Sequence, residues 1–189
     1  MNVDFKKTAL IVIDLQKGVL AMPCVPHSAQ AVVENSAKLM EAFQKEGSFV
    51  AVVHVPRPDD SSLNPVLDDS DGASPADFPL DWDEIVPEIQ KYDSHHIVQK
   101  RQWGAFYGTD LDAQLRRRGI NTLILCGVST AYGVDTTARE AFQHGYHQIF
   151  AIDAMAGFTE EEHEYVKTFI FPKIGRIRTT DELLALTEK

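Results

Sequence analysis

The sequence has few cysteines and no long apolar run, and each shortage excludes a class of protein. Its two cysteines, Cys24 and Cys126, form neither a CxxC metal pair nor a disulfide framework, so both are expected as reduced thiols. No stretch approaches the roughly 18 apolar residues of a membrane-spanning helix. The first apolar run, TALIVID, is short and ends in an aspartate, which is unlike a signal peptide. We therefore expect a cytoplasmic protein.

Positive charge is also scarce. The chain has 189 residues, with 18 lysines and arginines against 28 aspartates and glutamates, and a formal net charge of -10. Its basic residues cluster only at Arg116, Arg117 and Arg118, which argues against nucleic acid or an anionic membrane as a partner. With no internal repeat, residues 1–189 are expected to form a single domain, large enough to bury a core without disulfides or a metal.

What the sequence does contain is an alternation of strand and helix patterns. Short β-branched runs are separated by stretches of helical periodicity, such as residues 29–45, which is typical of βαβ units around a parallel sheet. The runs are apolar on both faces, as in a sheet that helices cover on each side. We predict a Rossmann-like three-layer α/β/α sandwich with a mostly parallel sheet of about six strands. The expected strands are TALIVID, SFVAVVHV, HHIVQK, NTLILCG, HQIFAID and RIRTT.

Local signals mark the ends of several helices. Thr109 with Asp112, and Thr159 with Glu162, resemble capping boxes that begin helices. Two glycines, Gly119 and Gly145, are expected to end helices.

Residues 56–93 break the alternation. This segment is rich in Pro, Asp and Ser and has no sustained periodicity, although DWDEIVPEI is expected to contain a helical turn. A long irregular insertion in a compact domain serves as a lid, an interface arm or a mobile loop. The sequence leaves these three roles open.

The residues that finish the strands are the first candidates for chemistry, because ligands bind beyond the carboxyl ends of an open parallel sheet. Asp14 closes the first strand, where desolvation favours a protonated carboxyl group unless a cation balances it; a helix cap or turn aspartate is the alternative. Lys100 ends HHIVQK, where its ammonium can pair with Asp14 or bind an anionic substrate, or remain a solvated surface group.

The stretch GVSTAYGVDTTARE, residues 127–140, joins a strand to a helix. The side chains near this turn that can attack a substrate are Ser129, Thr130 and Tyr132, and Gly133 stands at the helix entrance. The first N–H groups of a helix beginning there, together with its dipole, suit a carboxylate or a developing oxyanion. The alternative is a tight turn that needs a glycine.

The histidines do not form a metal-ligand pattern. His54, followed by Arg57, precedes a proline-broken loop, and a hydrogen-bonded core histidine is its expected role. Neighbours on a strand face opposite sides, so His95 and His96 cannot easily share one ion. We predict no metal and no cofactor, and leave open whether His54 or Arg57 contacts a ligand.

Three motifs together resemble the isochorismatase-like, or cysteine hydrolase, family, which includes isochorismatases, nicotinamidases and N-carbamoyl amidases. They are ALIVIDLQ, which contains Asp14; residues 100–106, which fit K-x-x-x-[SG]-A-F from Lys100; and CGVSTAYGVDTTAREA. The resemblance covers nearly the whole chain and implies a hydrolase that acts on a small molecule.

The chain departs from the amidase branch of that family at one position. There the third motif resembles GVxTxxCVxxTxxxA, whose cysteine is the nucleophile and whose neighbours supply oxyanion N–H groups, often next to a cis peptide. The cysteine position falls on Gly133, which has no side chain with which to form an acyl-enzyme. Cys126 lies within a strand, where a small buried side chain is expected, and Cys24 lies in the MPCVPH loop.

A glycine at this position is similar to the isochorismatase branch, whose chemistry needs no covalent intermediate. The resemblance implies that an aspartate protonates the vinyl ether carbon, that water captures the oxocarbenium-like species, and that pyruvate leaves. Asp14 suits the acid role because a desolvated carboxyl group can stay protonated, and Lys100 orients it or neutralises a substrate carboxylate. The predicted catalytic residues are Asp14, Lys100 and Gly133.

The expected substrate is a small anionic cyclic or enol-ether compound resembling isochorismate. Its predicted contacts are Gln16, Trp103, Ser129, Thr130 and Tyr132, with Trp103 equally suited to the core or a subunit interface. Two other hypotheses stay open: an amidase or nicotinamidase-like hydrolase that uses water or another nucleophile, and a non-catalytic binding or assembly member of the family. Because family members commonly form dimers or larger assemblies, we expect a homodimer or higher homo-oligomer.

Overall fold

A parallel sheet organises the molecule. The structure, a computed structural model, describes residues 3–59, 66–69, 74–92 and 95–187, and within them six strands pair in the order β3-β2-β1-β4-β5-β6. Every neighbouring pair is parallel, so the predicted α/β fold with a mostly parallel sheet of about six strands is confirmed. The strands are β1 (Thr8–Ile13), β2 (Phe49–His54), β3 (His96–Gln99), β4 (Thr122–Val128), β5 (His147–Ala156) and β6 (Arg176–Arg178).

The central strand β1 explains why the sheet needs helices on both faces. All six of its residues are buried, and its side chains alternate between two separate apolar clusters. Ile11 and Ile13 belong to one cluster, whereas Leu10 and Val12 belong to the other. Burying each such aliphatic side chain stabilises the fold by about 1.5–3 kcal/mol, which favours a covered sheet.

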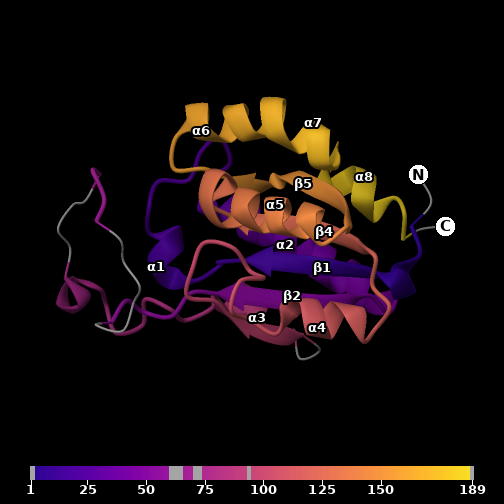
Figure 1. Ribbon diagram of the computed structural model, residues 1–189, viewed down its shortest axis with the longest axis horizontal. Coiled ribbons are helices and arrows are strands. Elements are labelled where there is room, and N and C mark those ends of the chain that lie inside the picture. Colours follow the sequence, from indigo (N-terminus) through magenta and orange to yellow (C-terminus); the bar gives the residue numbers. More distant parts are fainter. Residues whose placement is uncertain (1–2, 60–65, 70–73, 93–94, 188–189) are drawn as a thin grey trace.

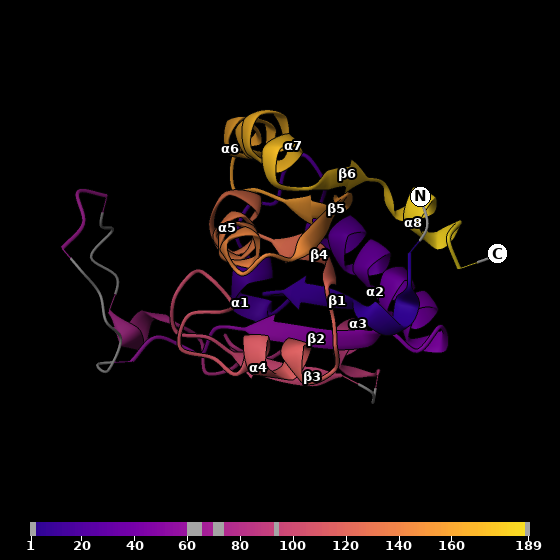
Figure 2. The same ribbon diagram turned by 45° about the vertical axis from the view of Figure 1, so that its right-hand side comes forward.

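Helices cover the two faces as separate layers. Buried side chains of α2 (Ala29–Lys45), α3 (Pro87–Gln90) and α8 (Thr180–Leu184) join the cluster of Leu10 and Val12. On the opposite face, the cluster of Ile11 and Ile13 takes side chains of α4 (Leu111–Arg116), α5 (Asp135–Gln143) and α7 (Phe171–Ile174). Figure 2 shows α2 and α5 on opposite sides of the sheet. The predicted three-layer sandwich is thus the observed fold.

One of the two predicted capping boxes is present. The Thr159 hydroxyl accepts the N–H of Glu162, and the Glu162 carboxylate accepts the N–H of Thr159, at the start of α6 (Glu160–Tyr165). The box predicted at Thr109 and Asp112 is wrong, because the Asp112 carboxylate accepts the Tyr146 hydroxyl at 2.7 Å and does not cap the helix. A long-range partner therefore outcompetes a local one at this helix start.

The predicted helix stops are confirmed. Gly119 and Gly145 have φ angles of 66° and 82°, the left-handed region that favours glycine after a helix. They follow the C-terminal turns of α4 and α5, where their N–H groups bond to the carbonyls of Arg116 and Phe142.

In the irregular segment after β2, the described residues ahead of α3 lie at the end of the sheet to which the strands point (Figure 1). We call its residues 74–86 the arm; it contains the short helix η2 (Pro75–Asp77) and leads into α3, which confirms the helical turn expected in DWDEIVPEI. Arg57 holds the arm by donating to the carbonyls of Pro75 and Phe78, at 2.6 and 2.9 Å. The arm is thereby fixed beside the carboxyl ends of the strands.

Candidate active site

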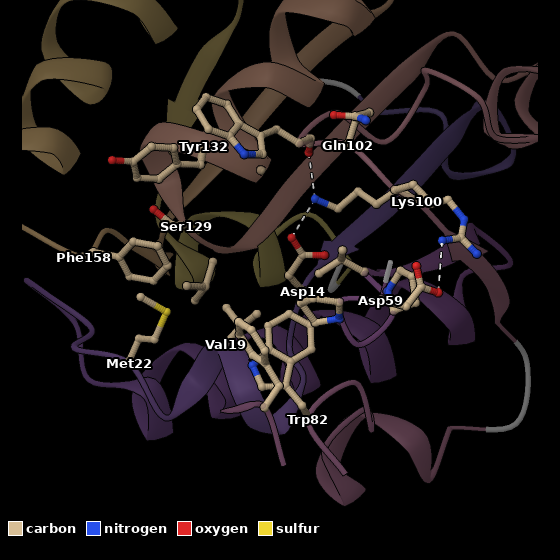
Figure 3. Close-up of a pocket in the computed structure, with 18 of the residues that line it drawn as sticks. Asp14, Val19, Met22, Asp59, Trp82, Lys100, Gln102, Ser129, Tyr132 and Phe158 are labelled. Carbon is tan, nitrogen blue, oxygen red and sulfur yellow. Dashed lines mark hydrogen bonds and ion pairs between the residues drawn. The ribbon is translucent and has the colours of Figure 1, made fainter. Parts of the chain in front are cut away.

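Asp14 and Lys100 form a buried ion pair at the carboxyl edge of the sheet. Asp14 directly follows β1, and Lys100 directly follows β3, two strands away in the sheet. Their backbone N–H groups bond to the carbonyls of Val53 and His54, the last two residues of β2, which fixes where each side chain begins. Lys100 Nζ lies 2.7 Å from Asp14 Oδ2, and the two side chains are only 3% and 8% exposed (Figure 3).

Burial and the ion pair act on Asp14 in opposite directions. Desolvation favours the uncharged acid and is the larger effect, while the Lys100 charge and its hydrogen bond favour the carboxylate, so the pKa of Asp14 is raised to about 6. Lys100 Nζ is held in place by the Trp103 carbonyl, 2.7 Å away. Lys100 donates to Oδ2 of the Asp14 carboxyl group, whereas Oδ1 of this group has no hydrogen-bond partner among the described residues. Oδ1 is therefore the oxygen free to carry a proton.

Gly133 approaches this ion pair from the other half of the sheet. After β4 the chain enters a π-helical turn, η3 (Thr130–Val134), which continues into α5; the Val128–Ser129 peptide bond before it is cis. A Cβ atom on Gly133 would lie 2.9 Å from Asp14 Oδ2 and 3.2 Å from Lys100 Nζ. The three residues predicted to be catalytic thus converge on one point, and a side chain at position 133 would press on the ion pair.

A backbone carbonyl closes the turn around Gly133. The Ser129 carbonyl accepts the N–H groups of Tyr132 and Val134, at 3.2 and 3.1 Å. The first N–H groups of a helix have no carbonyl partner within it, which makes them available to an anionic ligand.

A cavity of about 610 Å³ opens over Asp14, Lys100 and Gly133. Its polar wall includes Ser129, whose hydroxyl oxygen is buried and has no partner among the described residues. The other walls combine aromatic side chains with valine, proline and methionine side chains, as is usual for a pocket that binds a small organic molecule. The aromatic side chains are Phe78, Trp82, Trp103, Tyr132 and Phe158.

Three of the predicted substrate contacts line this cavity. They are Ser129, Tyr132 and Trp103, and the last two pack edge to face with ring centroids 4.9 Å apart. The Tyr132 hydroxyl donates to Glu162 at 2.7 Å, so the capping-box carboxylate of α6 also anchors a pocket wall. Although Trp103 is 60% exposed, its ring therefore belongs to the mouth of the cavity.

Gln16 is not among the residues that line the cavity. Its amide nitrogen donates to the Val55 carbonyl at 2.9 Å, and its amide oxygen accepts the Val55 N–H at 3.0 Å. A further, longer bond of 3.4 Å reaches the Trp82 carbonyl. Gln16 is completely buried, and its amide joins the chain after β1 to the chain after β2 and to the arm.

Thr130 is also not among the lining residues. Its hydroxyl lies 2.8 Å from His163 Nδ1, and both side chains are completely buried. Burial lowers the pKa of His163 to about 4, so this histidine is neutral near pH 7. Thr130 and His163 thus join η3 to α6 behind the cavity.

The arm supplies cavity residues that the sequence did not predict. Trp82 and Phe78 line the cavity and pack edge to face, with ring centroids 5.6 Å apart. The Trp82 ring lies against Gly18, where a Cβ atom would come within 2.0 Å of it. Two aromatic residues in an otherwise Pro-, Asp- and Ser-rich segment are the sequence signal that could have indicated them.

Ion pairs secure the arm next to α1 (Lys17–Leu20). Lys17 Nζ lies 2.9 Å from the Asp81 carboxylate and 2.7 Å from that of Glu84. Each exposed pair of this kind contributes little alone, but both pairs lie next to Trp82 in the sequence and tie this part of the arm to α1.

The cysteines and histidines lie away from the cavity wall. Cys126 is completely buried in the sheet, where desolvation raises the pKa of its thiol to about 12, and Cys24 packs against the α2 side of the core. His96 pairs with Asp110. Within the described part of the chain, no group of three or more His, Cys, Asp or Glu side chains is placed to hold a metal ion. Likewise, none of the described helices has the length and apolar character to cross a membrane.

Known proteins resemble this chain over nearly its whole length. The isochorismatase domain model matches residues 8–182. YwoC of Bacillus subtilis, an uncharacterized isochorismatase family protein, is 52% identical over 185 residues, 97% of this chain and 96% of that protein. A probable isochorismatase of Pseudomonas chlororaphis is 27% identical over 187 residues, 97% and 87% of the two chains. The solved structure of an isochorismatase family protein from Burkholderia thailandensis has a TM-score of 0.91 at 36% identity, covering 100% of this chain and 98% of that one.

Proposed function

We propose that this chain, which belongs to the isochorismatase family of hydrolases, hydrolyses a small anionic cyclic or enol-ether compound, such as isochorismate, with Asp14 as general acid. The observation that carries the proposal is the environment of Asp14. Its carboxyl group is buried in the cavity, has a pKa of about 6 and faces Gly133, which offers no nucleophilic side chain. A general acid works best when its pKa lies near the working pH.

The reaction begins with the proton on Asp14. The proton moves to the terminal carbon of the enol ether, which leaves an oxocarbenium ion next to the ionised carboxylate. Water adds to the cationic carbon and loses a proton, and the resulting hemiketal breaks into pyruvate and an alcohol. No covalent bond to the protein forms at any step, so this reaction does not require a cysteine at position 133.

Lys100 serves both states of Asp14. While Asp14 is protonated, the ammonium charge is available to a substrate carboxylate. Once the proton has left, Lys100 stabilises the new carboxylate across the 2.7 Å ion pair. Because the Trp103 carbonyl also holds Nζ, the charge does not have to be repositioned during the reaction.

The remaining cavity residues suit a small ring compound with an anionic group. Ser129, Tyr132, Trp103 and the backbone N–H groups near Gly133 are proposed to contact the substrate. The cavity of about 610 Å³ lies within the roughly 300–1,000 Å³ of small-molecule pockets, and its aromatic walls suit a flat ring.

Release of pyruvate from isochorismate tests the proposal. The wild-type protein is expected to turn over, and the Asp14→Asn variant to lose about 100-fold or more in kcat, the usual contribution of a general acid. Thermal denaturation checks that the variant is folded. Equal rates for the two proteins would remove Asp14 from the acid role.

An amidase-like activity is the second candidate, because the buried hydroxyl of Ser129 faces the cavity without a partner among the described residues. It would use water or Ser129 on a small amide. Hydrolysis of an amide panel that Ser129→Ala abolishes would favour it over the first proposal. If neither substrate class turned over while small acids still bound, a non-catalytic binding or assembly role would be left.

We further propose that the chain works in the cytoplasm as a single domain, and as a homodimer or higher homo-oligomer. Apolar side chains near the arm support the assembly: Val66 and Leu80 are 103% and 89% exposed. Sedimentation equilibrium of the purified chain tests the assembly; a monomer at micromolar concentration would contradict it.

A further inference from the structure

The loop that holds Lys100 has no regular secondary structure, yet part of it is buried. We call residues 101–110 the Lys100 loop; Gly104, Ala105 and Phe106 within it are buried although they belong to neither helix nor strand. Buried backbone N–H groups need partners, and here the sheet does not supply them. The partners are side chains of α5, the helix that follows the turn carrying Gly133.

Thr137 is the first of these partners. Its hydroxyl is completely buried, accepts the N–H of Ala105 at 3.0 Å and donates to the Gly133 carbonyl at 2.6 Å. A single oxygen atom therefore joins the Lys100 loop to the turn that carries Gly133. A threonine hydroxyl that bonded only within its own helix would fix nothing outside it.

Glu140, one helical turn further along α5, is the second partner. One of its carboxylate oxygens accepts the N–H of Phe106 at 3.0 Å. The carboxylate occupies the space beside Gly104, where a Cβ atom would come within 2.1 Å of it. The absence of a side chain at position 104 thus lets Glu140 reach the backbone of the loop.

We propose that Thr137 and Glu140 are positioning residues of the active site. They clamp the Lys100 loop onto α5, so that the Trp103 carbonyl holds Lys100 Nζ against Asp14 and next to Gly133. Neither residue lines the cavity, and each acts through the backbone of the loop. The role in turnover rests on the proposed function, whereas the effect on Asp14 is a property of the free protein.

The clamp has a consequence that can be measured on Asp14 without substrate. Lys100 is the charge that offsets the desolvation of this carboxyl group, and Asp59 and Arg101 are the other charged groups that line the same cavity. When the loop loosens, Lys100 Nζ moves away and its stabilisation of the carboxylate falls. The titration midpoint of Asp14 then rises above about 6.

The first experiment is a carbon-13 NMR titration of protein labelled at the aspartate carboxyl carbons, with the Asp14 signal assigned by its loss in Asp14→Asn. Thr137→Val and Glu140→Leu are expected to raise the Asp14 midpoint by about one pH unit, because a nearby opposite charge contributes about one to three units. Gly104→Ala, which pushes Glu140 off the loop, is expected to shift it in the same direction.

Matched controls separate the clamp from general damage to the helix. Thr136→Val alters the neighbouring, half-buried threonine of α5 and is expected to leave the midpoint unchanged. Thr137→Ser and Glu140→Gln each keep a hydrogen-bond acceptor at the same place. Both variants are expected to show the wild-type Asp14 midpoint. An unchanged midpoint in both Thr137→Val and Glu140→Leu, with either variant folded by circular dichroism, would overturn the proposal.

Turnover supplies the second readout. In a hydrolysis assay, Thr137→Val is expected to lower kcat by about 10- to 100-fold with little change in KM, since a displacement near 1 Å can cost that much. If the midpoint shifts while the wild-type protein hydrolyses neither an enol ether nor an amide, the clamp stands and the proposed function fails. If turnover is present and the midpoint does not move, the clamp fails alone.

Discussion

The two sides of the cavity are built in different ways. On one side, Asp14, Lys100 and Gly133 lie within a residue or a turn of a strand end, and the parallel sheet brings them together. On the other side, Trp82 and Phe78 lie on the arm, which ion pairs and side-chain bonds to backbone fasten in place. The strand-end side therefore fixes the charges, and the arm side shapes the rest of the cavity.

If this division is right, changes on the strand-end side lower kcat, whereas changes on the arm side raise KM.

The largest effect is expected for Lys100→Met. It leaves the Asp14 carboxylate buried without its counter-charge, so kcat/KM for enol-ether hydrolysis falls by about 1,000-fold, the scale of one lost electrostatic contact. The exposed Lys38→Met is the control and is expected to match the wild type.

Gly133→Ala is expected to come next. Its new methyl group would lie 2.9 Å from Asp14 Oδ2 and 3.2 Å from Lys100 Nζ, so the ion pair must shift. A shift of this kind lowers kcat by about 100-fold while leaving KM within a few-fold. Steady-state kinetics on folded protein measure it, and a rise in KM alone would place Gly133 on the substrate-binding side of the comparison.

The pH dependence addresses the strand-end side without a mutation. Because the folded pKa of Asp14 is raised to about 6, the protonated fraction falls as pH rises through that value. If the protonated form is the working acid, kcat/KM falls about tenfold per pH unit above pH 6. The same limb should be absent from the residual activity of Asp14→Asn, and a limb that persists there belongs to another group.

The smallest effect is expected on the arm side. A methyl group in Gly18→Ala would come within 2.0 Å of the Trp82 ring and displace it, so KM rises about five- to tenfold with kcat nearly constant. Trp82→Ala should do the same, and the double variant should be no worse than Trp82→Ala alone, because both changes remove one wall. Additive effects would mean that Gly18 acts on something other than Trp82.

The same division explains what the sequence could predict. The sheet and the positions of Asp14, Lys100 and Gly133 follow from strand patterns, since parallel strands end at one edge. Gln16 follows the same strand pattern two residues after Asp14, but its amide bonds to the Val55 backbone, and sequence spacing does not reveal such a partner. For the same reason the partner of Asp112 was missed.

Sequence patterns could not predict the position of the arm, for a different reason. Its place depends on contacts more than 60 residues apart in the sequence, such as Lys17 with Asp81 and Glu84. A segment without periodicity gives no indication of the direction in which Trp82 points. Its aromatic residues, unusual in such a segment, are the one sequence feature that could have indicated a role in a pocket.

One carboxylate described above links two properties that protein engineers usually treat separately. Glu162 caps α6 and also accepts the hydroxyl of Tyr132, a wall of the cavity. Any substitution at position 132 therefore also alters the electrostatic surroundings of a helix start. Libraries that vary position 132 alone would then select partly for thermal stability, and varying positions 132 and 162 together would separate the two.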